Sequence, residues 1–280
     1  MNKIRIIIGM VGFALVIGII YLGSLSLAVA LSAVMLIALT EMYKTLSLFK
    51  SSKAAAVLGY IFCIGFLVFN IRGVFLNSLD YSSFSLKFTI SIICYLIALG
   101  IYTVLCFDKT DFRLICVSFF STVYITVMFS HVLLVRQLNC GAVLVWVVLL
   151  SAWGTDTFAY TFGKMMGKTP LIPNVSSKKT VEGALGGIIG CVAVIVIFAL
   201  LCQSFGYKVR YSYLILLSVV SSVISQFGDL IASCIKRSYN AKDYGHILPG
   251  HGGMMDRFDS VLTVAPLVYY VCLLLPVITK

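Results

Sequence analysis

The sequence has 280 residues, of which 61% are hydrophobic and 11% are charged, and its mean hydropathy is +1.07. Ordinary soluble domains carry about 25% charged residues, so this composition excludes that class and predicts an integral membrane protein. The net charge of +11 is assigned to basic residues that flank membrane helices. Nucleic-acid binding is not expected, because the sequence contains no aromatic–basic module and no helix-turn-helix pattern.

Nine apolar segments are long enough to cross a bilayer as helices, and the alternating pattern typical of a membrane β-barrel is absent. The predicted spans are residues 4–22, 24–40, 54–70, 88–107, 114–135, 141–163, 183–205, 211–234 and 260–279. The apolar character continues past Ala30 to Leu39, which favours a retained helical hairpin over a cleaved signal peptide. We therefore expect an all-α membrane protein with about nine transmembrane helices.

The distribution of Lys and Arg predicts the orientation of the chain. If the N-terminus faces the cytoplasm, 15 of the 21 basic residues lie in inside segments and 6 lie in outside segments. This bias predicts N-terminus in and C-terminus out, with loops 164–182 and 235–259 on the same cytoplasmic side. Six of the ten acidic residues fall between positions 156 and 259. Within one compact unit, we therefore expect an N-terminal scaffold of residues 1–140 and a catalytic region of residues 141–280.

Asp229 lies near the cytoplasmic end of an apolar span, where a carboxylate costs roughly 3 kcal/mol or more unless it faces a partner or a cavity. Helical spacing places it on one polar stripe with Ser222, Ser225, Ser233 and Lys236. The stripe runs into a charged loop, which favours a functional role. The alternative is a salt bridge between helices that involves Lys236 or another base.

Asp256 and Asp259 are three residues apart, so in a helix both carboxylates project to one face. Together with Asp229 they would form an oxygen-rich site suited to Mg²⁺. The alternative is that Asp256 or Asp259 caps the N-terminus of the helix, a common role for aspartate.

A glycine-rich turn, Gly250-His251-Gly252-Gly253, precedes these carboxylates. Successive backbone N–H groups in such a turn can form a nest for phosphate oxygens. A phosphate contact is favoured for His251 over zinc ligation, because no second ligand lies at a zinc spacing. The basic residues around the turn are Lys236, Arg237, Lys242 and Arg257.

A second charged cluster lies earlier in the chain. Asp156 falls within an apolar span and again requires a partner there. Lys178 and Lys179 follow a proline-containing loop and directly precede the next predicted helix, where they are suited to bind phosphate. The alternative for this stretch is structural, with Thr180 as the helix cap and Glu182 in the first turn.

These residues together resemble the motifs of a known family, the phosphatidate cytidylyltransferases or CDP-diacylglycerol synthases. The similarity extends over roughly residues 150–260 and departs from the family pattern at Ser177, which is usually proline, and at Val181, which is often tryptophan. The matching segments are Asp156-x3-Tyr160-x2-Gly163, Lys179-Thr180-x-Glu182-Gly183, Gly228-Asp229-Leu230 and the long run from Ser233 to Asp259.

The resemblance implies the reaction of CTP with phosphatidic acid to give CDP-diacylglycerol and pyrophosphate, with Mg²⁺ as cofactor and a homodimer as the assembly. On this basis we assign Asp229, Asp256 and Asp259 as metal ligands, and the number of cations stays open. Asp156 either orients a base or joins the metal site. Phosphate binding is assigned to Lys178, Lys179, Lys236, Arg237, Lys242, His251, Gly252, Gly253 and Arg257.

Three other classes of protein fit the sequence less well. A proton-coupled secondary transporter fits the intramembrane carboxylates, but the polar residues concentrate on one membrane side and no inverted repeat is visible. A CDP-alcohol phosphotransferase would need D-G-x2-A-R…G-x3-D-x3-D, and the sequence lacks this string. A membrane scaffold leaves the charged loop unexplained. We expect a multi-pass protein of a bacterial inner membrane, with its active site facing the cytoplasm.

Overall fold

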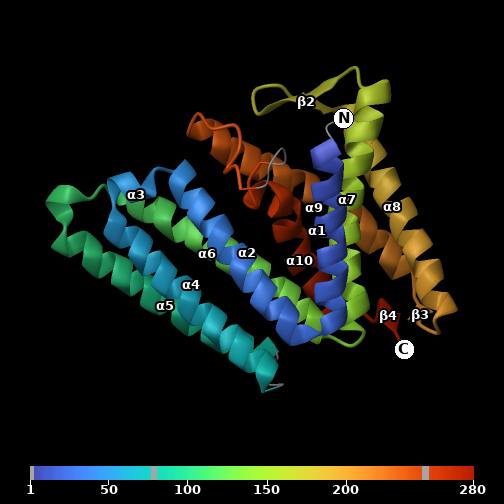
Figure 1. Ribbon diagram of the computed structural model, residues 1–280, viewed down its shortest axis with the longest axis horizontal. Coiled ribbons are helices and arrows are strands. Elements are labelled where there is room, and N and C mark those ends of the chain that lie inside the picture. Colours follow the sequence, from blue (N-terminus) through green and yellow to red (C-terminus); the bar gives the residue numbers. More distant parts are fainter. Residues whose placement is uncertain (1–2, 77–80, 248–251) are drawn as a thin grey trace. The chain divides into compact units, whose positions relative to one another are not determined.

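The computed structural model describes residues 3–76, 81–247 and 252–280 (Figure 1). Two compact units make up the chain. The N-terminal unit comprises Met1–Leu134 together with Asp243–Arg257, and the C-terminal unit comprises Val135–Lys242 together with Phe258–Lys280. The charged segment 243–257 therefore packs with the first half of the chain, although it lies far from that half in sequence.

The N-terminal unit is a group of helices joined by short turns. In chain order they are α1 (Lys3–Leu22), α2 (Ser24–Thr45), α3 (Leu48–Ser51), α4 (Lys53–Phe75), α5 (Tyr81–Leu105), the 3-10 turn η1 (Phe107–Lys109) and α6 (Phe112–Gln137). Ser52 caps α4, because its hydroxyl accepts a hydrogen bond from the Ala55 N–H at 3.2 Å. Large side chains such as Met35, Phe66 and Phe129 fill the core of this unit and are fully buried or nearly so.

Buried hydroxyl and amide groups also join the helices of the N-terminal unit. Thr122 on α6 hydrogen-bonds to the hydroxyls of Tyr43 on α2 and Tyr95 on α5. Asn70 on α4 donates to Ser130 Oγ on α6 at 3.0 Å. Such bonds hold apolar helices together where lipid offers no hydrophobic driving force for their association.

The C-terminal unit contains α7 (Gly141–Met166), α8 (Val181–Ser204), α9 (Tyr211–Ser238) and most of α10 (Met255–Leu274). A strand pair, β1 (Pro170–Ile172) with β2 (Ser176–Thr180), connects α7 to α8. A second pair joins β3 (Lys208–Val209) to β4 (Ile278–Thr279). In the view of Figure 1, the β1–β2 hairpin lies beyond the C-terminal end of α7.

Close packing of α7 against α8 depends on small residues. Gly183, Gly186, Gly187 and Gly190 lie on the face of α8 that meets α7. A Cβ at Gly183 would lie only 2.8 Å from the Ala159 carbonyl oxygen, so that position has no room for a side chain. Small residues at this spacing let two membrane helices approach closely, which brings the hairpin lysines near α7.

The all-α membrane class is confirmed. Among the described residues, eight helices are long and apolar enough to cross a membrane, and the described part of α1 adds a shorter apolar helix, Gly9–Leu22. These nine helices correspond to the nine predicted spans, while the number of crossings and the orientation stay predictions. Large apolar side chains are exposed along several of them, as expected for surfaces that face lipid.

The end of the chain differs from the prediction. The last span was expected at residues 260–279, but α10 begins at Met255 and ends at Leu274. Pro276 lacks an N–H donor and disfavours helical geometry at Leu275, which favours an end here, although the same helix accommodates Pro266 in its interior. The final residues instead pair with β3. The earlier start of α10 makes both Asp256 and Asp259 helical, as the sequence analysis supposed.

Candidate active site

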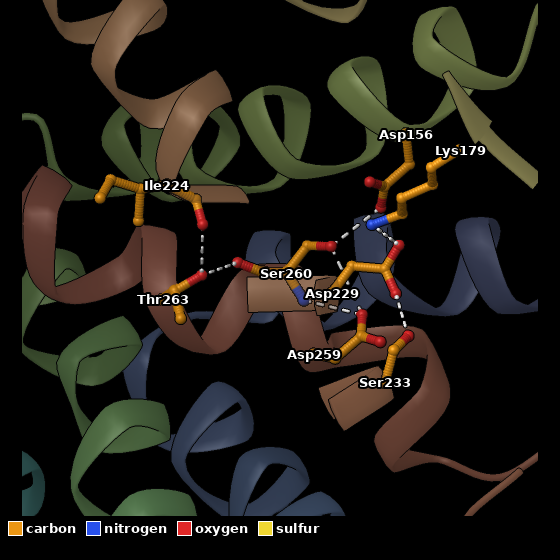
Figure 2. Close-up of polar contacts among 8 residues, drawn as sticks. All are labelled: Asp156, Lys179, Ile224, Asp229, Ser233, Asp259, Ser260 and Thr263. Atoms are coloured by element: carbon orange, nitrogen blue, oxygen red, sulfur yellow. Dashed lines mark hydrogen bonds and ion pairs between the residues drawn. The ribbon is translucent and has the colours of Figure 1, made fainter. Parts of the chain in front are cut away.

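Carboxylates from three helices of the C-terminal unit gather at one place (Figure 2). Asp156 comes from α7, Asp229 from α9 and Asp259 from α10. Asp259 is only 7% exposed and lies close enough to Asp156, Asp229 and Lys236 to interact with each electrostatically. Carboxylates so close to one another repel, and a cation among them relieves that repulsion, so this cluster is suited to bind positive charge.

One cation near the cluster is already present in the chain. Lys179 Nζ on β2 lies 2.7 Å from Asp229 Oδ2, and the two side chains are 26% and 32% exposed. Ser233, one turn further along α9, donates to Asp229 Oδ1 at 3.4 Å. The sequence analysis left open a salt bridge between Asp229 and Lys236 or another base, and the structure identifies Lys179 as the base.

The hairpin that carries Lys179 is anchored at both of its ends. Thr180 caps α8, since its hydroxyl accepts a hydrogen bond from the Gly183 N–H at 3.1 Å. The Glu182 carboxylate accepts from the N–H groups of Lys168 and Thr169 at 3.1 to 3.2 Å. The predicted cap at Thr180 and the predicted place of Glu182 in the first turn of α8 are confirmed.

Ser260 links two of the carboxylates, and the sequence analysis did not identify it. Its hydroxyl donates to Asp156 Oδ2 at 3.0 Å and also lies 3.4 Å from Asp259 Oδ1, while its N–H donates to Asp259 Oδ1 at 2.8 Å. A hydroxyl carries one proton, so it can serve only one carboxylate at a time. The sequence feature that could have identified Ser260 is its position directly after Asp259, where α10 changes from polar to mostly apolar residues.

Gly228 explains how α9 and α10 approach closely enough to place Asp229 near Asp259. A Cβ at Gly228 would lie 3.0 Å from the Asp259 carbonyl oxygen and would overlap the Thr263 side chain. Thr263 in turn donates to the Ile224 carbonyl oxygen of α9 at 3.2 Å. Gly228 therefore lets α9 and α10 pack closely, and the adjacent Asp229 carboxylate lies at the same height along the helices as Asp259.

A cavity of about 380 Å³ opens beside the Lys179–Asp229 pair. Its charged lining comes from Asp156, Lys164, Lys178, Lys179 and Asp229, and its other walls include apolar side chains. Lys178 is exposed, whereas Lys179 is partly buried. The arrangement is suited to an anionic headgroup attached to an apolar body, because positive charge and apolar surface share one wall.

The remaining predicted phosphate contacts of the C-terminal unit lie along the end of α9 and after it. Lys236 is 8% exposed, which is uncommon for lysine and indicates a buried electrostatic role. Arg237 is exposed, and its guanidinium donates to the Ala241 carbonyl oxygen at 3.0 Å. Lys242 is exposed.

The segment 243–257 belongs to the N-terminal unit. Asp256 Oδ2 accepts from the Gly253 N–H at 3.0 Å and from the Tyr244 N–H at 2.9 Å. Asp256 is the second residue of α10 and accepts N–H groups that lie before the helix, so it does not act as the N-cap that the sequence analysis allowed. Its role as a metal ligand stays a prediction. The Gly253 N–H is thus occupied within the chain. Gly252 has a φ of +82°, Arg257 is exposed, and His251 lies outside the described residues.

The predicted Mg²⁺ site was tested against these ligands. Within the described part of the chain, no three His, Cys, Asp or Glu side chains form a group that could hold a metal ion. Mg²⁺ in phosphate-transferring sites commonly takes only one or two carboxylates, and phosphate oxygens and water complete its coordination. Asp229 and Asp259 fit that smaller requirement, whereas a complete protein cage of three carboxylates is not seen among the described residues.

The fold and the site define a multi-span helical membrane protein with a lysine–carboxylate site suited to phosphate chemistry. A family model described as "Cytidylyltransferase family" matches residues 3–275. The phosphatidate cytidylyltransferase of Bacillus subtilis (strain 168) is 34% identical over 273 residues, which cover 96% of each chain. Those of Staphylococcus haemolyticus (strain JCSC1435) and Staphylococcus aureus (strain COL) are 39% identical over 166 residues, 59% of this chain and 62% of each relative. The chain belongs to the cytidylyltransferase family and is a nucleotidyltransferase, which confirms the resemblance seen in the sequence.

Proposed function

We propose that this chain transfers the cytidylyl group of CTP to phosphatidic acid, giving CDP-diacylglycerol and pyrophosphate. A phosphate oxygen of phosphatidic acid forms a new bond to the α-phosphorus of CTP, and the bond between that phosphorus and the oxygen bridging to the β-phosphate breaks. Pyrophosphate leaves with the bonding electrons. The lipid phosphate is already ionised at neutral pH, so the enzyme has to position two polyanions and stabilise the charge that develops between them.

The observation that carries this proposal is the Lys179–Asp229 pair beside the cavity. An incoming phosphate competes with Asp229 for the Lys179 ammonium group, because charge-assisted bonds to phosphate are strong. Once Lys179 binds phosphate, the Asp229 carboxylate becomes available to a cation. Lys178, on the same wall of the cavity, adds a second positive charge for the headgroup.

The apolar part of the cavity wall supports a lipid substrate. Ala159, Tyr160 and Leu171 line the cavity together with the charged residues. Tyr160 is 70% exposed, so the wall is continuous with the outer surface of α7. This geometry is suited to a lipid whose headgroup enters the site while its acyl chains stay in the bilayer.

We further propose that Asp229 and Asp259 hold Mg²⁺. Asp256, predicted from the sequence as a third ligand, stays a separate proposal, because its carboxylate already accepts the Gly253 and Tyr244 N–H groups. The bound cation would neutralise charge on the phosphates of CTP. Asp156 positions this site through Ser260, to which its carboxylate is hydrogen-bonded. The triphosphate contacts that we propose are Lys236, Arg237, Lys242, His251, Gly252 and Arg257. Gly253 was also predicted from the sequence, but its N–H already donates to Asp256.

The decisive test is the incorporation of radiolabelled CTP into lipid by the purified, detergent-solubilised protein, with and without Mg²⁺ and phosphatidic acid. Labelled lipid that requires both additions is expected. If no lipid is labelled although the protein is folded and both substrates are present, the proposed function is wrong.

Asp256→Asn separates the two roles of Asp256. The asparagine carbonyl oxygen can still accept the Gly253 and Tyr244 N–H groups, so these backbone contacts are retained while the negative charge is removed. We expect turnover to fall by much more than about threefold, because a metal contact contributes several kcal/mol. Turnover within about threefold of the wild type would overturn the ligand assignment.

We also propose nine crossings in a bacterial inner membrane, with a cytoplasmic N-terminus, a cytoplasmic active site and a homodimeric assembly. Cysteines introduced at Ser177 and Ser204, in a variant without the native cysteines, test the orientation. An impermeant maleimide should label the cysteine at position 204 in intact spheroplasts, and the cysteine at position 177 only after the membrane is opened. Chemical cross-linking in the membrane tests the dimer.

A further inference from the structure

Glu41 is a buried carboxylate in the N-terminal unit, within an apolar helix that the sequence analysis treated as scaffold. It lies near the C-terminal end of α2 and is 3% exposed. Its Oε1 accepts a hydrogen bond from the Met254 N–H at 3.1 Å, and its Oε2 accepts one from the Met255 N–H at 2.9 Å. One side chain of α2 thus receives both of these N–H groups, at the start of α10.

Two glycines of the charged segment pack directly on this carboxylate. A Cβ at Gly253 would lie 2.6 Å from Glu41 Oε2, and a Cβ at Gly245 would overlap the Glu41 carboxylate. A larger residue at either position would require the Glu41 side chain or the segment to shift. Gly245 and Gly253 therefore leave room for the Glu41 carboxylate, which reaches the N–H groups of Met254 and Met255 just after Gly253.

A second contact from α2 and two bonds within the segment complete the arrangement. Thr45, one turn after Glu41, donates its hydroxyl to the Tyr244 carbonyl oxygen at 3.3 Å. The Asp256 carboxylate accepts from the N–H groups of Tyr244 and Gly253, and so joins the two limbs to each other. The C-terminal end of α2 thus contacts a segment in which Asp256 links the residues near the start to those near the end.

The chemistry of Glu41 indicates that this contact has a purpose beyond packing. A carboxylate within a membrane helix is costly unless donors satisfy it. Here the donors are N–H groups at the N-terminal end of a helix, where the helix dipole also favours negative charge. An apolar side chain would fill the same space at lower cost, but it could not hold the backbone of the segment.

We propose that Glu41 is a positioning residue for cytidylyl transfer. It holds residues 252–257 at the start of α10 in one conformation, and Asp256 and Arg257 are thereby presented to the phosphates of CTP. This inference rests on the proposed function, because the role of the segment in binding CTP does. Glu41 itself contacts backbone N–H groups and acts through the segment.

Amide hydrogen exchange on the full-length protein tests the contact independently of activity. Glu41→Met keeps a side chain of similar length without an acceptor for the N–H groups. We expect amide exchange in peptides covering residues 253–257 to become about tenfold faster or more, since two bonds to a charged acceptor are lost. The matched control is Asn70→Ala, which removes a buried hydrogen bond elsewhere in the same unit and should leave exchange in these peptides unchanged. Unchanged exchange in Glu41→Met would overturn the proposal.

Steady-state kinetics test the positioning role. For Glu41→Gln, which keeps one acceptor, we expect kcat/KM for CTP to fall by about tenfold or more while KM for phosphatidic acid stays within about twofold. Glu41→Asp, which keeps the charge but retracts it, should retain more activity than Glu41→Met. Equal losses toward both substrates, or a loss that only tracks the fraction of folded protein, would make Glu41 merely structural.

Thr45→Val is a milder variant in case the Glu41 variants do not fold. It removes one hydrogen bond to the segment and should raise KM for CTP without changing KM for phosphatidic acid. An unchanged KM for CTP would count against the proposal that α2 positions the segment. The two proposals fail differently. If wild-type protein labels no lipid, the cytidylyl-transfer function is wrong, whereas unchanged exchange in an active Glu41→Met variant removes only the positioning role.

Discussion

Lys179 Nζ on the β1–β2 hairpin lies 2.7 Å from Asp229 Oδ2 on α9, at the mouth of a cavity of about 380 Å³. Both side chains are partly exposed, so the pair contributes at most about 1 kcal/mol to stability. Since the hairpin is already anchored by Thr180 and Glu182, folding does not require the pair. Its position beside the cavity instead indicates a role in binding charged substrates.

Replacing Lys179 by Met should therefore separate activity from stability. We expect kcat/KM for phosphatidic acid or CTP to fall by roughly 10- to 100-fold, because a charge-assisted contact contributes about 1.5–3 kcal/mol. The melting temperature should change little. Lys208→Met, an exposed lysine on β3 away from the cavity, is the matched control and should leave both quantities unchanged. Wild-type kinetics for Lys179→Met would contradict a substrate role.

Ser260→Ala should lower turnover by about tenfold, because it removes the hydroxyl that donates to Asp156 while the backbone bond to Asp259 remains. Thr263→Val is the matched control. It removes a hydroxyl from the same helix that donates only to carbonyl oxygens, of Ile224 and Ser260. The measurement is initial rate at saturating substrates. Equal rates for the two variants would show that the Ser260 hydroxyl has no special role.

Gly183→Ala should destabilise the C-terminal unit by about 1–3 kcal/mol, because the new Cβ would lie 2.8 Å from the Ala159 carbonyl oxygen and neither backbone can move freely. Gly154→Ala is the control, since its Cβ would lie 3.9 Å from Val194, an ordinary contact. That variant should be neutral or slightly stabilising. Thermal unfolding in detergent measures both, and a stable Gly183→Ala protein would show that α7 and α8 pack less tightly than described.

Removal of Mg²⁺ by EDTA should abolish turnover, and added Mg²⁺ should restore it. Asp229→Asn and Asp259→Asn should each raise the Mg²⁺ concentration needed for half-maximal rate by about tenfold or more, because a charged ligand is lost. Asp111→Asn changes an exposed carboxylate that accepts only a local N–H bond from Arg113, so it should leave that concentration unchanged. A Mg²⁺ dependence in Asp259→Asn equal to that of the wild type would remove Asp259 from the metal site.

Much of this protein could be predicted from local pattern. Long apolar runs predicted the helices to within a few residues in most cases, since a bilayer leaves few alternatives to a helix. The cap at Thr180 was also predicted, because capping depends on neighbours only a few residues away. The end of α10 was missed by five residues although Pro276 marked it, since the apolar composition continues past that proline.

The charged chemistry was likewise visible as residue types, but the pairing of those residues was not. Helical spacing allowed Lys236 or another base as the partner of Asp229, and the structure supplies Lys179 from a hairpin. The sequence pattern did not identify Ser260, and it assigned the helix that carries Glu41 to the scaffold. In each case the contacting groups come from elements far apart in the chain.

Composition and periodicity by themselves determined that the chain is a helical membrane protein. The residue types of its second half predicted acids and bases suited to phosphate as the candidate site, and that assignment stays a prediction. Only the tertiary structure decided that Ser260 joins Asp156 to Asp259 and that Glu41 of the first half holds segment 243–257. The reason is that helix formation and capping are local, whereas these contacts require backbones to approach within a few ångströms. Close approaches of this kind occur at Gly183, Gly228, Gly245 and Gly253. The residues next to each glycine in sequence do not indicate which distant residue it will contact.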